Sequence, residues 1–323
     1  MTTNNNSSYV YTGFYRDRDP TDYSLVNHIP HKLQDWVEED KLDLRRLAQN
    51  PRGIDYINEK MLKKYDIDCL NNISMNPNGI RIIENNINRV NWNILSDNPN
   101  AINIITENLD KVNWDILSGN TGAIDILEAN IEKINWINIS NNPSAIRIIE
   151  NNLDKVDWMW LSENPNAIHI LKDNIDKIHW QSLSLNPNAI AILEKYPEKI
   201  DWDLLSGNIN AISLLENNIE KIAWYRLSIN INAINILKNN LDKINWGLLT
   251  LNPNAGELLK NNTDKINWKW ISDNPVIFKI DHNIKHPLSS AIEEELMIKC
   301  FHPHRVELYL YKYNYIIGID EYF

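Results

Sequence analysis

The sequence lacks the features that mark disulfide-rich, secreted or membrane-spanning proteins. Its 323 residues include only two cysteines, Cys69 and Cys300, whose wide separation gives no disulfide framework. No apolar run reaches the roughly 18 residues of a membrane-spanning helix, and residues 1–9 are too polar for a signal peptide. We therefore expect a soluble protein of a reducing, cytoplasmic compartment.

Basic residues and glycines are also scarce. The chain has 32 Lys and Arg against 43 Asp and Glu, a net charge of −11, which disfavours binding to nucleic-acid phosphates or to an anionic membrane. It has nine glycines and no Walker, GxGxxG, HExxH, CxxC or GxSxG motif. Cysteine and histidine are residue types that bind metal ions, and they occur together at Cys300, His302 and His304. However, Cys-x-His-x-His is not a spacing known for zinc sites, so we interpret these residues as part of a turn. The sequence predicts no enzyme, no cofactor and no metal site.

Tryptophan, by contrast, is abundant and strictly periodic. It recurs every 22 residues, and such a period is the signature of a solenoid built from one small unit in tandem. Because a large apolar side chain at one register is typical of a core, we predict that these indoles are buried structural residues, although stacking on bases or sugars is the alternative. The positions are Trp92, Trp114, Trp136, Trp158, Trp180, Trp202, Trp224, Trp246 and Trp268.

The unit from Asn98 to Gly119 (NPNAINIITENLDKVNWDILSG) predicts two helices. Asn98 followed by proline is typical of a helix start, and the apolar spacing predicts a first helix over 99–108. Asn108 recurs at its end, which favours a left-handed helix cap. A short second helix is expected from Trp114 to Ser118, with Asn113 as its cap.

The repeat defines four segments of the chain. We expect a partly disordered arm over residues 1–30, an N-terminal cap with divergent repeats over 31–75, regular repeats over 76–275 and a helical cap over 276–323. Leu44 takes the tryptophan register in the first divergent unit, Trp36 is expected to pack at the N-terminal end, and an insertion falls near 63–68. Helices over 287–300 and 303–312 are expected to cap an open C-terminal end.

Acidic residues and lysines form a second periodic feature. They occupy adjacent registers on the turn before each tryptophan helix. We predict that they form a row of solvated ion pairs. The alternative is a charged ladder that binds a ligand. The acidic row is Asp110, Glu132, Asp154, Asp176, Glu198, Glu220, Asp242 and Asp264, and the basic row is Lys111, Lys133, Lys155, Lys177, Lys199, Lys221, Lys243 and Lys265.

Two further registers vary between units on the otherwise constant frame. Variable residues in a fixed frame are how solenoids recognise extended ligands, and they are also what neutral drift gives at solvated positions. The first row is Arg81, Asn103, Asp125, Arg147, His169, Ala191, Ser213, Asn235 and Glu257; the second, directly after tryptophan, is Asn93, Asp115, Ile137, Met159, Gln181, Asp203, Tyr225, Gly247 and Lys269.

Three aromatic residues break the repeat and are predicted to be binding anchors. Tyr225 lies in the second variable row, whereas Trp160 and Trp270 lie two residues after a repeating tryptophan. Aromatic side chains are enriched at binding hot spots. The predicted partner-binding set joins them to Arg81, Arg147, Met159, His169 and Gln181.

Three motifs stand out along the chain: LQDWVEEDKLD around Trp36, the tandem NPNAI…W…LS units and the closing FHPHRVELYLYKYNY. In these motifs the chain resembles the short tandem-repeat proteins of giant DNA viruses of the mimivirus type, and the resemblance covers roughly residues 30–323. It implies an all-helical repeat protein made in the cytoplasm of an infected cell, and it brings no catalytic residues.

Together these patterns predict an all-α protein, an α-solenoid of about ten 22-residue helix–turn–short-helix repeats with N- and C-terminal caps. The expected function is a non-enzymatic scaffold that binds a protein or peptide through its variable positions. The alternative is a structural component of a virion or viral factory that uses the rod as a spacer. Recognition of single-stranded RNA is a third reading, which the charge disfavours.

Overall fold

Each 22-residue repeat folds into an outer and an inner helix. In the computed structural model, which describes residues 31–54, 56–57 and 67–280, the unit from Asn98 contains the 3-10 turn η5 (Pro99–Ala101), helix α8 (Ile102–Thr106) and helix α9 (Trp114–Leu117). The other units follow the same plan. The all-α solenoid of 22-residue repeats is therefore confirmed.

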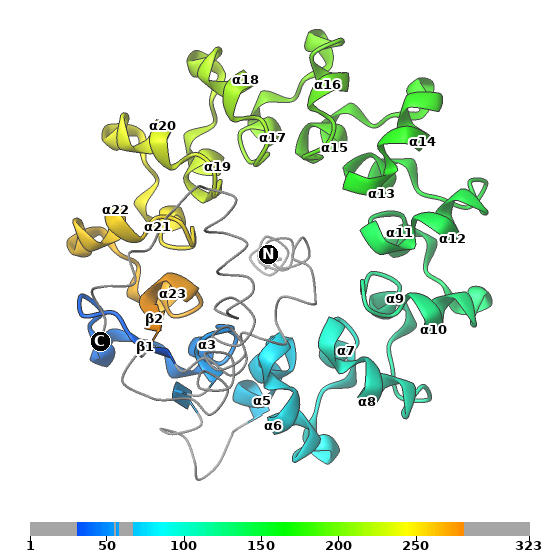
Figure 1. The fold of residues 1–323 in the computed structure, drawn as a ribbon, viewed down its shortest axis with the longest axis horizontal. Coiled ribbons are helices and arrows are strands. Elements are labelled where there is room, and N and C mark those ends of the chain that lie inside the picture. Colours follow the sequence, from blue (N-terminus) through cyan, green and yellow to red (C-terminus); the bar gives the residue numbers. More distant parts are fainter. Residues whose placement is uncertain (1–30, 55, 58–66, 281–323) are drawn as a thin grey trace, which may run out of the picture.

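The units curve into a ring with two walls (Figure 1). The tryptophan helices line the inner wall and the helices that follow the Asn-Pro starts line the outer wall. The remaining inner helices are α3 (Leu44–Leu47), α5 (Ile67–Met75), α7 (Trp92–Leu95), α11 (Trp136–Ser140), α13 (Trp158–Glu163), α15 (Trp180–Leu185), α17 (Trp202–Leu205), α19 (Trp224–Ile229), α21 (Trp246–Leu249) and α23 (Trp268–Ile271). The remaining outer helices are α6 (Ile80–Glu84), α10 (Ile124–Glu128), α12 (Ile146–Glu150), α14 (Ile168–Asp173), α16 (Ile190–Leu193), α18 (Ile212–Glu216), α20 (Ile234–Lys238) and α22 (Gly256–Lys260).

Short 3-10 turns flank the helices. One set begins at proline and precedes the outer helices, except at the last unit. Proline suits this position because its pyrrolidine ring presets φ and because a backbone N–H here would have no helical partner. Besides η5, this set comprises η3 (Pro77–Gly79), η7 (Pro143–Ala145), η8 (Pro165–Ala167) and η14 (Pro275–Ile277). A second set leads into the inner helices: η2 (Glu39–Lys41), η4 (Ile87–Arg89), η6 (Ile131–Lys133), η9 (Ile175–Lys177), η10 (Pro197–Lys199), η11 (Ile219–Lys221), η12 (Leu241–Lys243) and η13 (Thr263–Lys265).

The asparagines at the ends of the outer helices do not adopt the left-handed conformation, so that prediction is wrong. Asn130, for example, has φ −137° and ψ 50°. Its side-chain amide donates to the Ile126 carbonyl at 2.9 Å, and Asn108 makes the same bond to Ile104. These asparagines end the helix by satisfying a carbonyl that the last turn leaves free.

The asparagine at the start of each unit has a second role that capping does not describe. Asn164 is fully buried, and its Oδ1 accepts from the Asn166 N–H at 3.0 Å, as a cap should. Its Nδ2 donates backward to the Ser140 and Asn142 carbonyls of the preceding unit, both at 3.0 Å. Only a side-chain amide combines the acceptor and the donors. The same bonds recur around the ring from Asn76, Asn98, Asn120, Asn142, Asn186, Asn208, Asn230, Asn252 and Asn274, and we call the whole set the asparagine ladder.

The repeating tryptophans are half-buried rather than buried, which corrects the prediction. All nine pack against the core but keep part of the indole exposed. The fully buried positions of a unit are smaller, such as Ala167, Leu161 and Leu171 in the units around Trp158. Trp36 is also half-buried and contacts the core, as predicted. The indoles therefore form the edge of the core, and the leucines and alanines form its centre.

The two ends of the array meet and close the ring. Strand β1 (His31–Leu33) pairs antiparallel with strand β2 (Phe278–Ile280), and the Gln34 N–H donates to the Ile277 carbonyl at 2.7 Å. Figure 1 shows α3 beside α23, the first and last inner helices of the ring. The sequence predicted an open C-terminal end, and a rod in the alternative reading; the pairing of β1 with β2 shows instead that the two borders of the array meet.

The closing junction uses the same bonds as every other junction. Asn50 donates to the Ser272 and Asn274 carbonyls, both at 3.0 Å, so it completes the asparagine ladder. The Asp43 N–H donates to the Ser272 hydroxyl at 2.8 Å, just as the Asp157 N–H donates to a serine of its preceding unit. Counting Asn50, eleven ladder asparagines complete the circle, one more than the ten units expected.

Several predictions fall outside the described residues. These are the arm over 1–30, most of the insertion near 63–68, the helices over 287–300 and 303–312, and the cluster at Cys300, His302 and His304. The described part of the expected C-terminal cap, residues 276–280, consists of the end of η14 and strand β2. No described helix is long and apolar enough to cross a membrane.

Candidate interaction surfaces

The first variable row lies on the outer wall. All of its members are exposed, as the prediction of a binding row requires. However, three of them bond to an adjacent unit: Arg147 to Glu128, His169 to Glu150 at 2.7 Å, and Glu257 to Lys238 at 2.8 Å. The bond from Lys238 holds the pKa of Glu257 below its usual value. These outer-wall side chains therefore already link neighbouring units.

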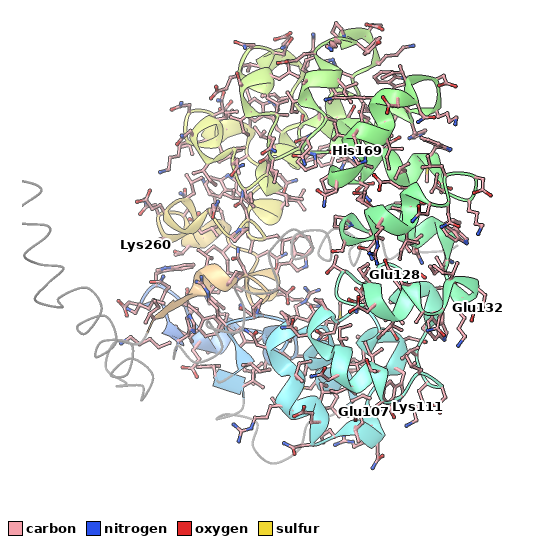
Figure 2. The ribbon with its side chains drawn as sticks, turned by 45° about the vertical axis from the view of Figure 1, so that its right-hand side comes forward. Glu107, Lys111, Glu128, Glu132, His169 and Lys260 are labelled. Atoms are coloured by element: carbon pink, nitrogen blue, oxygen red, sulfur yellow. The ribbon has the colours of Figure 1, made fainter. Side chains whose placement is uncertain are left out.

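The charged side chains of the outer wall do not gather into one site. In the part of the chain that the structure describes, no three His, Cys, Asp or Glu residues are placed to hold a metal ion. Figure 2 shows charged side chains spread over separate outer helices and turns, among them Glu107, Lys111, Glu128, Glu132, His169 and Lys260. The outer wall thus offers a mixed, solvated surface.

The adjacent rows of acidic residues and lysines do not form the predicted ion pairs. No ion pair within the described residues includes a member of either row. Instead, the lysine lies over the indole of the preceding unit, where an exposed cation–π contact contributes about 0.5–1 kcal/mol. The contacts, 4.2–5.1 Å from Nζ to the ring centroid, are Lys111–Trp92, Lys133–Trp114, Lys155–Trp136, Lys177–Trp158, Lys221–Trp202, Lys243–Trp224 and Lys265–Trp246.

Two positions show that this stacking is a property of the register. At Trp180 the contact comes from Tyr196, whose ring centroid lies 5.1 Å away. At the closing junction Lys41 lies 5.1 Å from the ring of Trp268. Each of the nine repeating indoles is thereby contacted by a side chain of the next unit, and part of it stays exposed.

The second variable row lies on the inner helices. Every member except the half-buried Gly247 is exposed. Each unit touches the previous one here: Asn138 donates to the Asp115 carbonyl at 2.7 Å, and a Cβ added to Gly247 would lie 3.8 Å from the indole of Trp270. The position two residues after tryptophan therefore lies beside the position one residue after tryptophan in the preceding unit.

The predicted anchors have different environments on this wall. Trp270 is half-buried and its indole lies against Gly247 of the preceding inner helix. Tyr225 is 45% exposed, but its hydroxyl donates to the Asp203 carboxylate at 2.7 Å, and Arg226 Nε donates to the same group at 2.6 Å. Although partial burial opposes them, these two bonds hold the pKa of Asp203 below its usual value. Tyr225 is thus held in place by a polar cluster.

An exposed apolar patch occupies the adjacent part of the inner helices. Ile137 is 49% exposed and Met159 is 41% exposed, and they hold the same register in consecutive units. Trp160, which is half-buried, lies at the register that contacts residue 137 of the preceding unit. We call Ile137, Met159 and Trp160 the inner-wall patch. Contiguous apolar side chains left exposed on a soluble surface are typical of binding sites.

Sequence reasoning missed the asparagine ladder, although a signal was present. Asparagine is kept at its register in the units where proline is replaced by Thr121, Ile209 and Ile231. A cap alone tolerates serine, threonine or aspartate. Strict retention of the amide therefore indicated a donor role as well.

Comparison of the chain with protein-family models, with curated proteins and with solved structures gives no match.

Proposed function

We propose that the protein is a non-enzymatic ring scaffold that binds a protein or peptide partner on its inner wall. The observation that carries the proposal is the inner-wall patch, where Ile137 and Met159 are exposed side by side on a frame whose other large apolar side chains mostly pack inward. Exposed apolar side chains of this size supply the energy of protein interfaces.

The polar part of the same wall supports this assignment. The Asp203–Tyr225–Arg226 cluster lies further along the inner helices, with Gln181 in the unit between it and Met159. Because its side chains are already held by mutual bonds, a partner would meet a preorganised polar surface. Of the predicted set, Met159, Trp160, Gln181 and Tyr225 thus share one surface.

The remaining predicted contacts receive less support. Arg147 and His169 are engaged with Glu128 and Glu150, and Arg81 lies with them on the outer wall. Exposed ion pairs contribute little energy to binding or folding. The proposal therefore favours the second variable row over the first, and it involves no cofactor.

The test is affinity capture from the cells in which the protein is naturally made, with quantitative mass spectrometry. The variant Ile137→Ser/Met159→Ser removes the apolar character of the inner-wall patch. The matched control is Leu153→Ser/Leu241→Ser, because these leucines are 38% and 48% exposed but lie on the turns between outer and inner helices, outside the inner-wall patch. Loss of the same partners from the patch variant alone supports the proposal, whereas equal loss from both variants, or loss from the control alone, contradicts it.

A structural role is the alternative, and the closure of the ring favours it. A ring in which first and last units join by the ordinary junction has a fixed size, which suits a building block of a virion or viral factory. The resemblance to repeat proteins of giant DNA viruses motivates this reading. Detection of the chain at fixed stoichiometry in purified particles, with no loss from the patch variant, would favour it over partner binding.

A further inference from the structure

The junction between the first and last units differs from all the others in its covalent chemistry. Elsewhere the chain itself runs from each unit into the next, but here α3 and its cap Asp43 meet residues 272–274 through non-covalent contacts and the β1–β2 pair. We call this junction the seam. It is the place where the ring can open while every unit keeps its own fold, since local opening follows the weakest connection.

The seam contains the one charged side chain that is buried in the described part of the chain. Asp273 is 1% exposed, and its Oδ2 accepts from the Arg46 guanidinium across the seam at 2.5 Å. Its Oδ1 has no hydrogen-bond partner. Acidic residues at the same register of other units, Asp97 and Glu163, are only half-buried. A buried carboxylate with one unpaired oxygen is costly, so this position is set apart from its equivalents.

The charge state of this carboxyl depends on whether the seam is closed. Burial raises the pKa of Asp273 to about 7, because the lowering effect of Arg46 is too small to offset the loss of water and Asp43 opposes it. Among the described residues, the charged groups that face it are Arg46 and Asp43, both from α3 and its cap. When the seam opens, water reaches the carboxyl and its pKa returns toward the ordinary value of 3.8. The closed form therefore binds the proton more tightly than the open form, and closure is strongest below pH 3.8 and weakens as the pH rises to about 7.

We propose that the seam is a proton-controlled latch, in which neutral Asp273 keeps the ring closed and its ionisation lets the ring open between Asn274 and Asn50. The asparagine ladder and the β1–β2 pair supply the closing contacts, and the burial of the Asp273 carboxyl at the seam, which Arg46 only partly offsets, makes closure depend on pH. Opening would admit a chain from the side to the inner wall, so the latch controls access whatever the partner is.

Hydrogen–deuterium exchange of the full-length chain tests the latch with native probes. The seam reporters are the Gln34 N–H, which bonds to Ile277, and the Asp43 N–H, which bonds to Ser272. The interior reporter is the Asp157 N–H, which bonds to Ser140 in the same register at 2.9 Å. Between pH 5.5 and 8.0 we expect protection at the seam, corrected for the intrinsic exchange rate, to fall about 30-fold. Protection at the interior reporter should stay constant.

Two variants make the test specific. Asp273→Asn places a permanently neutral side chain at the site and should abolish the pH dependence at the seam, whereas Glu128→Gln, which removes an ion pair on the outer wall, should leave it intact. Arg46→Met removes the opposing cation and should move the pH of opening upward. The proposal is overturned if wild-type protection at the seam does not fall, if the interior falls equally, or if Asp273→Asn keeps the wild-type profile. If the interior reporter shows that Asp273→Asn does not fold, the direction of the Arg46→Met shift decides.

Discussion

Replacing Asn164 by alanine should show how much one rung of the asparagine ladder contributes. The side chain is fully buried and makes three bonds. Its loss removes the side-chain donor to the Ser140 carbonyl, which costs about 1–3 kcal/mol for a buried acceptor. Loss of the cap on the Asn166 N–H costs about 1 kcal/mol more. The Asn142 carbonyl suffers less, because it still accepts from the Ala145 N–H at 3.1 Å. We expect a total of about 2–4 kcal/mol.

The matched control is Asn166→Ala in the same turn. Asn166 is exposed and its amide makes one inter-unit bond, to the Pro143 carbonyl at 2.9 Å, so its loss should cost about 0.5–1 kcal/mol. Urea unfolding followed by circular dichroism measures both. Asn164→Asp keeps the cap but turns the donor into an acceptor, so it should be at least as destabilising at pH 7 and partly relieved by acid. Equal urea midpoints for Asn164→Ala and Asn166→Ala would refute the ladder as a stabilising element.

Three further outcomes follow from the core, the outer wall and the closure. Leu161→Ala, at a fully buried site, should lower the free energy of unfolding by about 2–5 kcal/mol. This loss should exceed that of Trp158→Ala, because the indole is only half-buried. Urea midpoints in the reverse order would contradict this assignment of the core. Glu128→Gln should leave the urea midpoint unchanged, since it removes only a surface ion pair, and a clear decrease would show that these pairs hold the units together. Deleting residues 142–163 removes one whole unit and should leave the interior units folded. Hydrogen exchange over 272–280 should rise, because ten units must then close a ring shaped for eleven. Global unfolding of this variant would contradict the model of interchangeable units.

The sequence was sufficient to predict the unit and its start. The 22-residue tryptophan period and the Asn-Pro pairs predicted an outer helix beginning near Pro99 and an inner helix beginning at Trp114, and the structure confirms both. These features depend on local chemistry, namely caps, proline geometry and apolar spacing. Contacts within one unit are repeated many times along the chain, which makes them visible in a single sequence.

Features that depend on contacts between units were not predicted. The curvature of the array comes from a small rotation between neighbouring units, and no residue type encodes whether these rotations add up to bring the last unit against the first. The half-burial of Trp158 and the position of Lys177 over its ring depend on how the next unit is placed. Similarly, the register of Ile137 predicted a solvated position, but only the ring showed that the residue belongs to an inner helix.

Because the circle is closed, every unit has the same two neighbours wherever in the circle the polypeptide begins. In an open solenoid the first and last repeats each lack a neighbour and tend to fray, whereas here every unit is flanked on both sides by bonds of one kind. Leu33 and Phe278 are paired across the strands, so the two borders of the array lie within one strand spacing of each other. A circular permutant that joins these borders and breaks the chain at another turn would keep the same set of neighbours for every unit.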